Sequence, residues 1–123
     1  AEVVKVHGQE IDTINNNLVK LSGSQTDGFE TGFIGGPDCR YSKVLGIITL
    51  NYAFSFSTPL TAQQQKILTL PVEFRPSRTV RALGLANGAI LLQVQINNNG
   101  DTYVNAVGTQ VSSGDARFSV TFT

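Results

Sequence analysis

The sequence predicts a mainly β protein, with an antiparallel six-strand β-barrel or sandwich head that follows a short N-terminal trimeric coiled-coil helix. Three observations support this prediction. Short runs of alternating apolar and polar residues, separated by turn signals, fill residues 44–123. Apolar residues recur every three or four positions over residues 3–21, which is the spacing of a heptad repeat. Between these stretches, residues 22–43 contain five glycines and one proline, which interrupt any regular pattern.

These stretches divide the chain of 123 residues into three expected parts. Residues 1–21 are expected to form a coiled-coil trimerisation helix and residues 22–43 a glycine-rich neck. Residues 44–123 are expected to form the antiparallel β head domain. The neck is not a purely flexible linker, because it contains large apolar side chains that need a place to bury. We expect these side chains to pack against the head or between chains: Phe29, Phe33, Ile34 and Tyr41.

The expected helix carries a narrow apolar stripe. A lone helix of this length, with Gly8 in its interior, is marginal in water, and a narrow stripe does not suit packing on a large core. Self-association removes both difficulties, and isoleucine at both core positions of the heptad favours three or more strands. We therefore expect a parallel homotrimer, while a helix docked on its own domain stays open as an alternative. The expected trimerisation residues are Val4, His7, Ile11, Ile14, Leu18 and Leu21.

The strands of the head are predicted from alternation and from turn residues. Residues 48–57 alternate between apolar and polar side chains, which is typical of a half-buried strand. The pair Asn87-Gly88 indicates a type I′ hairpin turn. In the last strand we expect Phe118, Val120 and Phe122 to point inward. The six expected strands cover residues 48–57, 67–70, 79–86, 89–96, 101–107 and 116–123.

A hairpin around an asparagine-rich turn is the most specific local prediction. The loop Asn98-Asn99-Gly100 suits a three-residue turn, because Gly100 adopts a positive φ without the steric cost of a Cβ atom. In the resulting register Asn97 pairs with Asp101, Gln95 with Tyr103, and Gln93 with Asn105.

One face of this hairpin is apolar, and the other carries amides, a phenol and no charge. Such a face offers both donors and acceptors, which suits the hydroxyl groups of a sugar. Two plainer interpretations stay open. The face could be an ordinary solvated strand surface, or it could be a contact between subunits, because Leu91 and Val107 share it.

Composition excludes several classes of function. The chain has nine basic and nine acidic residues, whereas a nucleic-acid-binding protein normally has a basic excess. No run of about 18 apolar residues is present, so we expect no membrane insertion. The single cysteine, Cys39, excludes a disulfide framework and lacks the partners of a zinc site.

The sequence offers little to an enzyme. The one histidine, His7, lies in the expected helix, and neither Cys39 nor any serine has an evident base partner. The acidic residues Glu73, Asp101 and Asp115 lie on expected turns, where such residues are common for structural reasons. We therefore expect no catalytic residues, no metal and no cofactor.

The order of these parts resembles the receptor-binding (lower baseplate) proteins of phages that infect lactococci and related Gram-positive bacteria. Residues 12–18, Asp-Thr-Ile-Asn-Asn-Asn-Leu, are similar to the N-terminal helix of these proteins. Residues 70–76, Leu-Pro-Val-Glu-Phe-Arg-Pro, followed by residues 93–100, are similar to their head domains. The resemblance covers most of the chain except the neck, and it is carried by the order of the motifs rather than by either one.

The resemblance implies a homotrimer at the tip of a phage tail, assembled in the host cytoplasm, that attaches the virion to host cell-wall saccharide. The N-terminal region would bind another baseplate protein. In related heads a His-x-Asp pair, a Trp and an Arg line a saccharide pocket between subunits. These positions fall on Gln93 and Gln95, on Asn105 and on Arg117, with Tyr103 close enough to replace the missing ring. Only Arg117 keeps its residue type.

Two alternatives to a receptor-binding head remain. The chain could be a purely structural trimeric module of a tail fibre or baseplate, or a secreted trimeric lectin-like domain.

A short cationic stretch, Arg75, Arg78 and Arg81, could bind phosphate oxygens. It could equally consist of solvated or loop-anchoring side chains.

Overall fold

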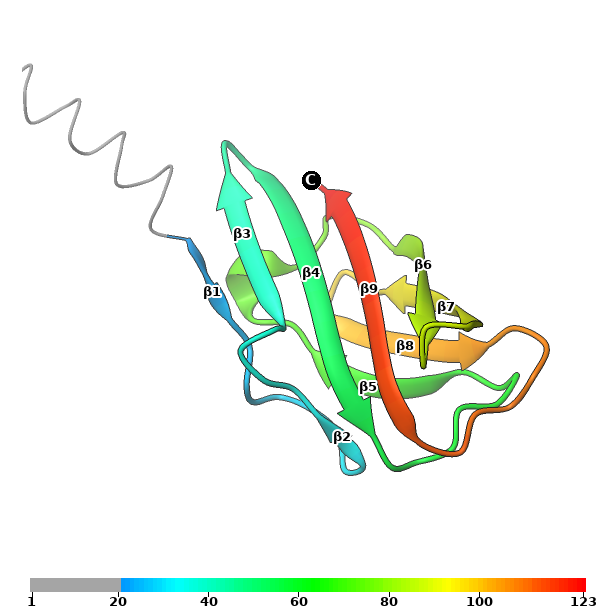
Figure 1. Cartoon of the computed structure of the whole chain (residues 1–123). Helices are drawn as coiled ribbons and strands as arrows, with labels where there is room; N and C mark the ends of the chain where they lie inside the picture. The colour runs from blue at the N-terminus through cyan, green and yellow to red at the C-terminus, as the bar shows by residue number, and fades with distance from the viewer. Residues whose placement is uncertain (1–20) are drawn as a thin grey trace, which may run out of the picture.

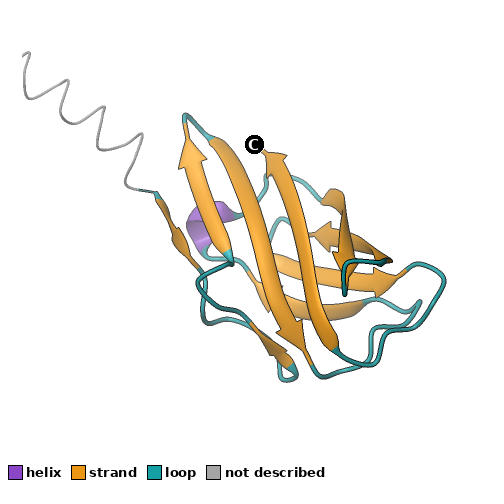
Figure 2. Ribbon diagram, viewed as in Figure 1, coloured by secondary structure: helices purple, strands orange, loops and turns teal. Residues whose placement is uncertain are grey.

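The computed structural model describes residues 21–123, so the predicted helix and its stripe from Val4 to Leu18 lie outside the described residues. Within them a single antiparallel sheet of nine strands forms the molecule, in the order β1-β3-β4-β9-β6-β7-β8-β5, with β2 paired to β4. The sheet curls, so that β4 and β9 lie on one side and β5, β7 and β8 on the other (Figures 1 and 2). The elements are β1 (Ser22–Ser24), β2 (Phe33–Ile34), β3 (Arg40–Val44), β4 (Ile47–Phe56), β5 (Gln65–Thr69), the 3₁₀ turn η1 (Val72–Phe74), β6 (Val80–Ala86), β7 (Ile90–Ile96), β8 (Asp101–Ala106) and β9 (Gly114–Phe122).

The six strands predicted for residues 44–123 are confirmed as β4 to β9, with shifts of a few residues at their ends. The predicted architecture needs correction, because one curled sheet, a half-barrel, takes the place of a closed barrel or a pair of sheets. The sheet also has nine strands rather than six, since residues 22–44 add three more. The final strand starts two residues earlier than expected, at Gly114.

The core lies inside the curl of the sheet. Along β4 the side chains alternate strictly, with Leu50, Tyr52 and Phe54 buried and their neighbours more exposed. This is the period of two that the sequence shows, because successive side chains of a strand point to opposite faces. Phe118 and Phe122 of β9 are buried as predicted, whereas Val120 is only partly buried.

The hairpin between β7 and β8 is confirmed in its predicted register. Gln93 pairs with Asn105, Gln95 pairs with Tyr103, and the Asn97 amide donates to the Asp101 carbonyl at 2.9 Å. Gly100 has φ of 91°, and a Cβ atom there would lie 2.6 Å from Nε of Arg75. Asn87 and Gly88 both have positive φ, as a type I′ turn between β6 and β7 requires.

The segment expected to be a neck runs from one edge of the sheet to the other. β1 pairs with β3, and β2 pairs with the end of β4. Between them, the Glu30 amide donates to the Ile67 carbonyl at 2.8 Å, and the Thr69 amide donates to the Gly28 carbonyl at 3.0 Å. These two bonds cover the outer edge of β5. Residues 22–34 therefore connect the β5 edge of the curled sheet to the β4 side.

The aromatic side chains of this segment pack against the head. Phe33 is buried, and the ring of Phe29 lies 6.3 Å from that of Phe54. Tyr41 stacks on Phe74 of η1, with ring centroids 4.1 Å apart. These aromatic side chains therefore pack against the head, which is one of the two places expected for them. Ile34, which was expected to pack with them, is instead 71% exposed.

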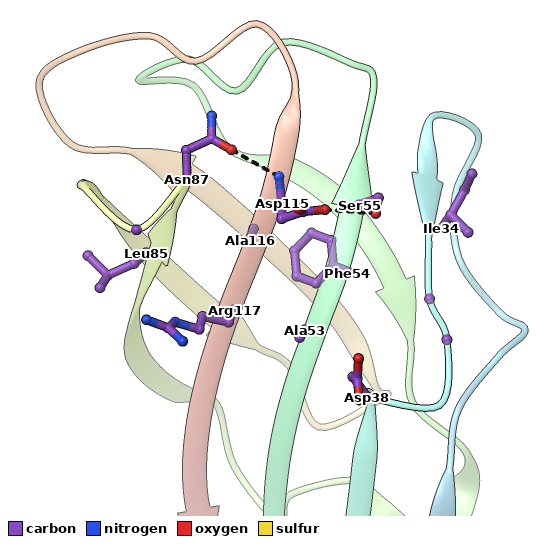
Figure 3. Close-up of a pocket in the computed structure, with 13 residues that line it drawn as sticks. Ile34, Asp38, Ala53, Phe54, Ser55, Leu85, Asn87, Asp115, Ala116 and Arg117 are labelled. Carbon is purple, nitrogen blue, oxygen red and sulfur yellow. Dashed lines mark hydrogen bonds between the residues drawn. The ribbon is translucent and has the colours of Figure 1, made fainter.

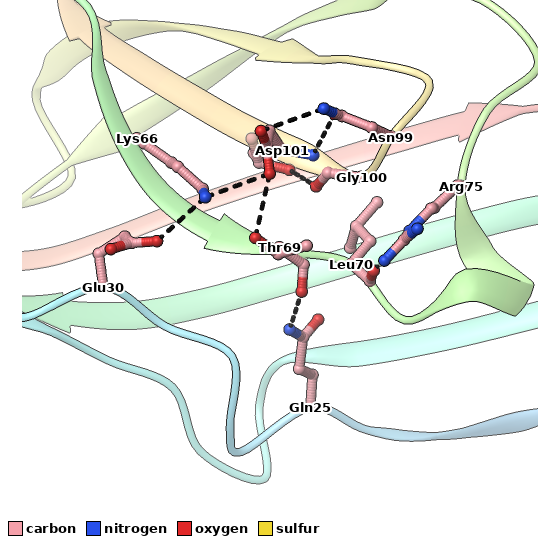
Figure 4. A network of polar contacts seen from close by, with 10 residues as sticks. Gln25, Glu30, Lys66, Thr69, Leu70, Arg75, Asn99, Gly100 and Asp101 are labelled. Carbon is pink, nitrogen blue, oxygen red and sulfur yellow. Dashed lines mark hydrogen bonds and ion pairs between the residues drawn. The ribbon is translucent and has the colours of Figure 1, made fainter.

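Gln25 is a buried polar residue at the centre of this connection. Its side-chain amide donates to the carbonyl of Thr69 in β5 at 2.9 Å, and its Oε1 accepts a hydrogen bond from the hydroxyl of Tyr52 in β4. Its backbone amide donates to the Cys39 carbonyl at 2.8 Å. One side chain therefore links strands on both sides of the curl, and Figure 4 shows its bond to Thr69.

An ion-paired network lies beside it on the β5 edge (Figure 4). The Lys66 ammonium lies 3.3 Å from the Glu30 carboxylate and 3.2 Å from that of Asp101. Asp101 also accepts hydrogen bonds from Thr69 at 3.1 Å and Asn99 at 3.2 Å. Desolvation acts to raise the pKa of Asp101, but these donors outweigh it and lower the pKa below its usual range. The pKa of Lys66 is raised, first by its hydrogen bond to Asp101.

Replacing Tyr52 with phenylalanine is expected to lower the free energy of unfolding by about 1–3 kcal/mol, because it leaves the buried Gln25 oxygen without its donor. Chemical denaturation measures the change. Tyr103→Phe is the matched control, since the Tyr103 hydroxyl has no hydrogen bond among the described residues, and its effect should stay within about 0.5 kcal/mol. Equal effects of the two substitutions would contradict the role given to Gln25.

The Asp101 network is expected to make stability fall in acid. The pKa of Asp101 is lower in the folded than in the unfolded chain, so its carboxylate stabilises the fold above the unfolded pKa of about 3.9. That contribution is lost as the pH falls through the folded pKa. Asp101→Asn should therefore cost about 0.5–1 kcal/mol at neutral pH and progressively less at lower pH. Denaturation of both proteins between pH 7 and pH 2 tests this, and a cost that does not change with pH would refute it.

Candidate functional site

The outer, solvent-facing side of β6, β7 and β8 carries four of the five residues predicted to bind saccharide. In the strand register Gln93 lies beside Asn105, and Gln95 lies beside Tyr103. Gln93 is exposed, and the other three side chains are partly exposed. The sequence prediction that these four side chains share one face is confirmed by the register; their binding role stays a prediction. We call this surface the amide face.

The amides on this face hold one another in place. Asn105 donates to Oε1 of Gln93 at 3.2 Å, and Gln95 donates to Oδ1 of Asn97 at 3.0 Å. Gln64 in turn donates to Oε1 of Gln95 at 3.3 Å. In the part of the chain that the structure describes, the Gln93 amide nitrogen has no hydrogen-bond partner. The face is therefore ordered and still offers donors to a ligand.

A hollow of about 450 Å³ lies at the β6–β7 side of the amide face, where Gln93, Gln95 and Arg81 of β6 line it. Arg81 pairs with Gln95 in the register, so its guanidinium and the Gln95 amide line the same space. The three arginines of the cationic stretch thus differ in role. Arg75 anchors a loop through its bond to the Leu70 carbonyl at 3.0 Å, whereas Arg81 faces the hollow and Arg78 is exposed elsewhere.

Arg117, the fifth predicted residue, lies on the same side of the sheet but not in this hollow. It pairs with Leu85 of β6, and Leu85 pairs with Leu91 of β7. Strand β6 therefore lies between Arg117 and the strand of Gln93. Three leucines form a ridge there, which we call the leucine ridge: Leu83, Leu85 and Leu91. The Leu83 side chain is 62% exposed. The structure brings four of the predicted residues together and places the fifth beyond the ridge.

Arg117 lines a second and larger hollow (Figure 3). This cleft of about 640 Å³ lies between the loop after β2, the ends of β4 and β9, and the turn that follows β6. Two small residues, Ala53 and Ala116, are among those that line it. Its polar side chains come from four separate parts of the chain and are Asp38, Ser55, Asn87, Asp115 and Arg117.

Asp115 is braced from both neighbouring segments. The Ser55 hydroxyl donates to Oδ1 of Asp115 at 2.9 Å, and the Asp115 amide donates to Oδ1 of Asn87 at 3.0 Å. The Asn87 side chain also donates to the Ser113 carbonyl at 3.0 Å. A close approach of Gly114 to Asn87 makes this possible, because a Cβ atom on Gly114 would lie 1.9 Å from Asn87 Oδ1.

The cleft combines the groups that a polyhydroxylated ligand needs. The carboxylates of Asp38 and Asp115 accept hydrogen bonds from hydroxyl groups, and the Arg117 guanidinium donates several in a fixed fork. Among the described residues Arg117 has no ion-pair partner, so its donors are available. The aliphatic side chains of Ile34 and Leu85 supply apolar walls for the C–H face of a ring. We call this hollow the Arg117 cleft.

Sequence reasoning missed most of the Arg117 cleft. Asp115 was interpreted as a turn acid and Asn87 as a turn residue, and Asp38 lay in the expected neck. One signal was present, because Asp115 and Arg117 are two residues apart and therefore share a strand face. The partners of that face come from β4, some 60 residues earlier, and no local pattern indicates this pairing.

Residues 21–123 hold neither a cluster of metal-ligating side chains nor a helix that could span a membrane. No three histidine, cysteine or acidic side chains there come close enough to hold a metal ion. No helix within these residues has the length and apolar character to cross a membrane.

The comparisons with known proteins give a likeness to solved structures and no match by sequence. No protein-family model and no curated protein match the chain. Among solved structures, the chain is similar to the crystal structure of the head domain of phage bIL170, a receptor-binding domain of a lactococcal phage. The two are 13% identical with a TM-score of 0.53, over 80% of this chain and 91% of that chain. The resemblance inferred from the sequence is thereby confirmed at the level of the fold.

Gly114→Ala is expected to destabilise the protein by more than about 1 kcal/mol, because alanine is strained at the Gly114 φ of 138° and its Cβ collides with Asn87. Thermal or chemical unfolding measures the loss. Gly108→Ala is the control, since Gly108 also has a positive φ of 86° but its Cβ would meet nothing within 4 Å. A loss at Gly114 no larger than that at Gly108 would show that Asn87 does not brace the cleft.

Proposed function

We propose that this chain is the head of a phage receptor-binding protein that attaches the virion to host cell-surface saccharide without hydrolysing it. The fold shared with the bIL170 head domain carries the proposal, because that domain binds a receptor and the likeness covers most of both chains. The sequence resemblance, which rests on different evidence, indicates the same class of protein.

The outer side of the sheet supports saccharide as the ligand. The amide face offers Gln93, Gln95 and Asn105 as uncharged donors and acceptors, with the Tyr103 ring beside them. The Arg117 cleft adds carboxylates, a guanidinium and aliphatic walls. Together they match the mixture of hydroxyl groups and apolar ring faces that a sugar presents. The proposed saccharide-binding residues are therefore Gln93, Gln95, Tyr103, Asn105 and Arg117.

The remaining parts of the proposal concern assembly. The stripe from Val4 to Leu21 joins three chains into a homotrimer, and the N-terminal region binds another baseplate protein at the tail tip. The particle is assembled in the bacterial cytoplasm. Each shallow site binds weakly, and three sites per trimer on many trimers raise the overall avidity by orders of magnitude.

Binding of the full chain to whole cells tests the proposal. The fluorescently labelled protein is incubated with a panel of lactococcal strains and with their purified wall saccharides. We expect binding to a subset of strains and to the saccharide from those strains, and we expect excess protein to delay phage adsorption on them. If no saccharide binds and adsorption is unaffected, the chain is not a receptor-binding head, and the structural-module alternative takes its place.

Substitutions then locate the site. Three single substitutions are made: Arg117→Ala removes the guanidinium, and Gln93→Ala and Asn105→Ala each remove one of the paired amides. Each should weaken saccharide binding about tenfold or more, because each removes a hydrogen bond to the ligand. Arg78→Ala is the matched control, because it removes the same charge from an exposed position outside both hollows. Binding by all three site variants at the level of Arg78→Ala would contradict this placement.

A further inference from the structure

The turn between β3 and β4 is an exposed apolar tip. Its residues are Val44, Leu45, Gly46 and Ile47, none of which is charged. The Leu45 side chain is 83% exposed, and those of Val44 and Ile47 are 44% and 48% exposed. The charged residue nearest to the tip in the sequence is Lys43, and its ammonium donates to the Glu73 carbonyl at 3.3 Å.

Leu45 is an unexpected residue at the first central position of the turn between β3 and β4. Leu45 has φ of 52° and Gly46 has φ of 79°, so both central residues of the turn lie in the left-handed region. Asparagine, aspartate and glycine adopt that conformation at little cost, whereas leucine does not. Nothing within the described chain compensates, since the side chain is exposed. A residue that is unfavourable for its own turn and exposed to water points to a contact outside this domain.

The place where the N-terminal segment joins the domain suggests what makes the contact. The backbone amide of Lys43 donates to the carbonyl of Leu21 at 2.8 Å, so the chain enters the domain directly beside the tip. Leu21 is the last residue of the apolar stripe. Leu45 lies two residues beyond Lys43, which places it within about 7 Å along the chain.

We propose that the tips of three copies of this chain pack against one another, so that Val44, Leu45 and Ile47 extend the trimer contact from the stripe into the head. The inference rests on the homotrimer in the proposed function. If the three stripes meet at one axis, Leu21 lies beside that axis, and the tip next to it surrounds the same axis. The absence of charge on the tip lets three identical surfaces meet without repulsion. The contact would also fix how each head is rotated about the axis.

Association of the full chain measures the contribution of the tip. Leu45→Asn keeps a residue that favours the left-handed turn while it removes the apolar side chain, so the variant folds. We expect sedimentation equilibrium to show trimer formation that is at least about tenfold weaker, as for loss of a buried leucine. Leu83→Asn is the matched control, because Leu83 is 62% exposed on the outer side of β6. Weaker association of Leu83→Asn with normal association of Leu45→Asn would place the subunit contact on the amide face and overturn the inference.

Cross-linking gives a second readout that does not depend on affinity. Leu45→Cys places a thiol on the tip, and mild oxidation should join pairs of chains into covalent dimers on a non-reducing gel. The native Cys39 is fully buried and does not compete, because burial raises the pKa of its thiol. Leu83→Cys should give no dimers. A trimer in which Leu45→Cys remains uncrosslinked, or a chain that is monomeric at every concentration, overturns the inference. Cell binding of the unsubstituted chain decides separately on the receptor-binding role.

Discussion

The buried amide of Gln25 is the interaction on which the shape of this protein depends. A curled sheet that does not close must keep its two sides at a fixed distance, and Gln25 does this by bonding Tyr52 of β4 and the Thr69 carbonyl of β5. The side chain is almost completely buried, so each of these bonds forms where water cannot replace it. Backbone pairing of residues 28–30 with β5 and of β2 with β4 continues the same connection. The glycine-rich segment is therefore a structural part of the head, and its glycines allow it to cross between strands that lie far apart in the sheet.

The outer side of the sheet depends on this connection indirectly. The loop after β2 forms one wall of the Arg117 cleft, so the segment that joins the sides of the curl also completes the cleft. The opposite wall comes from the turn after β6, where Asn87 braces Asp115. Between this cleft and the amide face lies the leucine ridge, which prevents the two hollows from merging. A ligand that reached both hollows would cross apolar side chains and would need an apolar surface of its own at that point.

The sequence allowed the local parts of this structure to be predicted, because local rules decide them. Alternation along residues 48–57 follows directly from the geometry of a strand, and the register of the β7–β8 hairpin follows from Gly100 in its turn. Four of the five predicted site residues were placed together for the same reason. Pairings between distant segments could not be predicted. The bond from Gln25 to Thr69 joins residues 44 positions apart, and a glutamine in a glycine-rich stretch resembles part of a linker. The Arg117 cleft was missed because its walls come from four separate segments, each of which had an adequate local explanation.

The covered edge of β5 has a consequence for how these domains behave when crowded together. A strand at the margin of a sheet presents unpaired backbone groups that can recruit a strand from another molecule and begin aggregation. Here residues 28–30 occupy that margin, and within the described residues the opposite margin is the three-residue strand β1. Strands this short give little template for intermolecular pairing. Many copies can therefore be crowded together without fusing into extended sheets, which the proposed multivalent attachment requires.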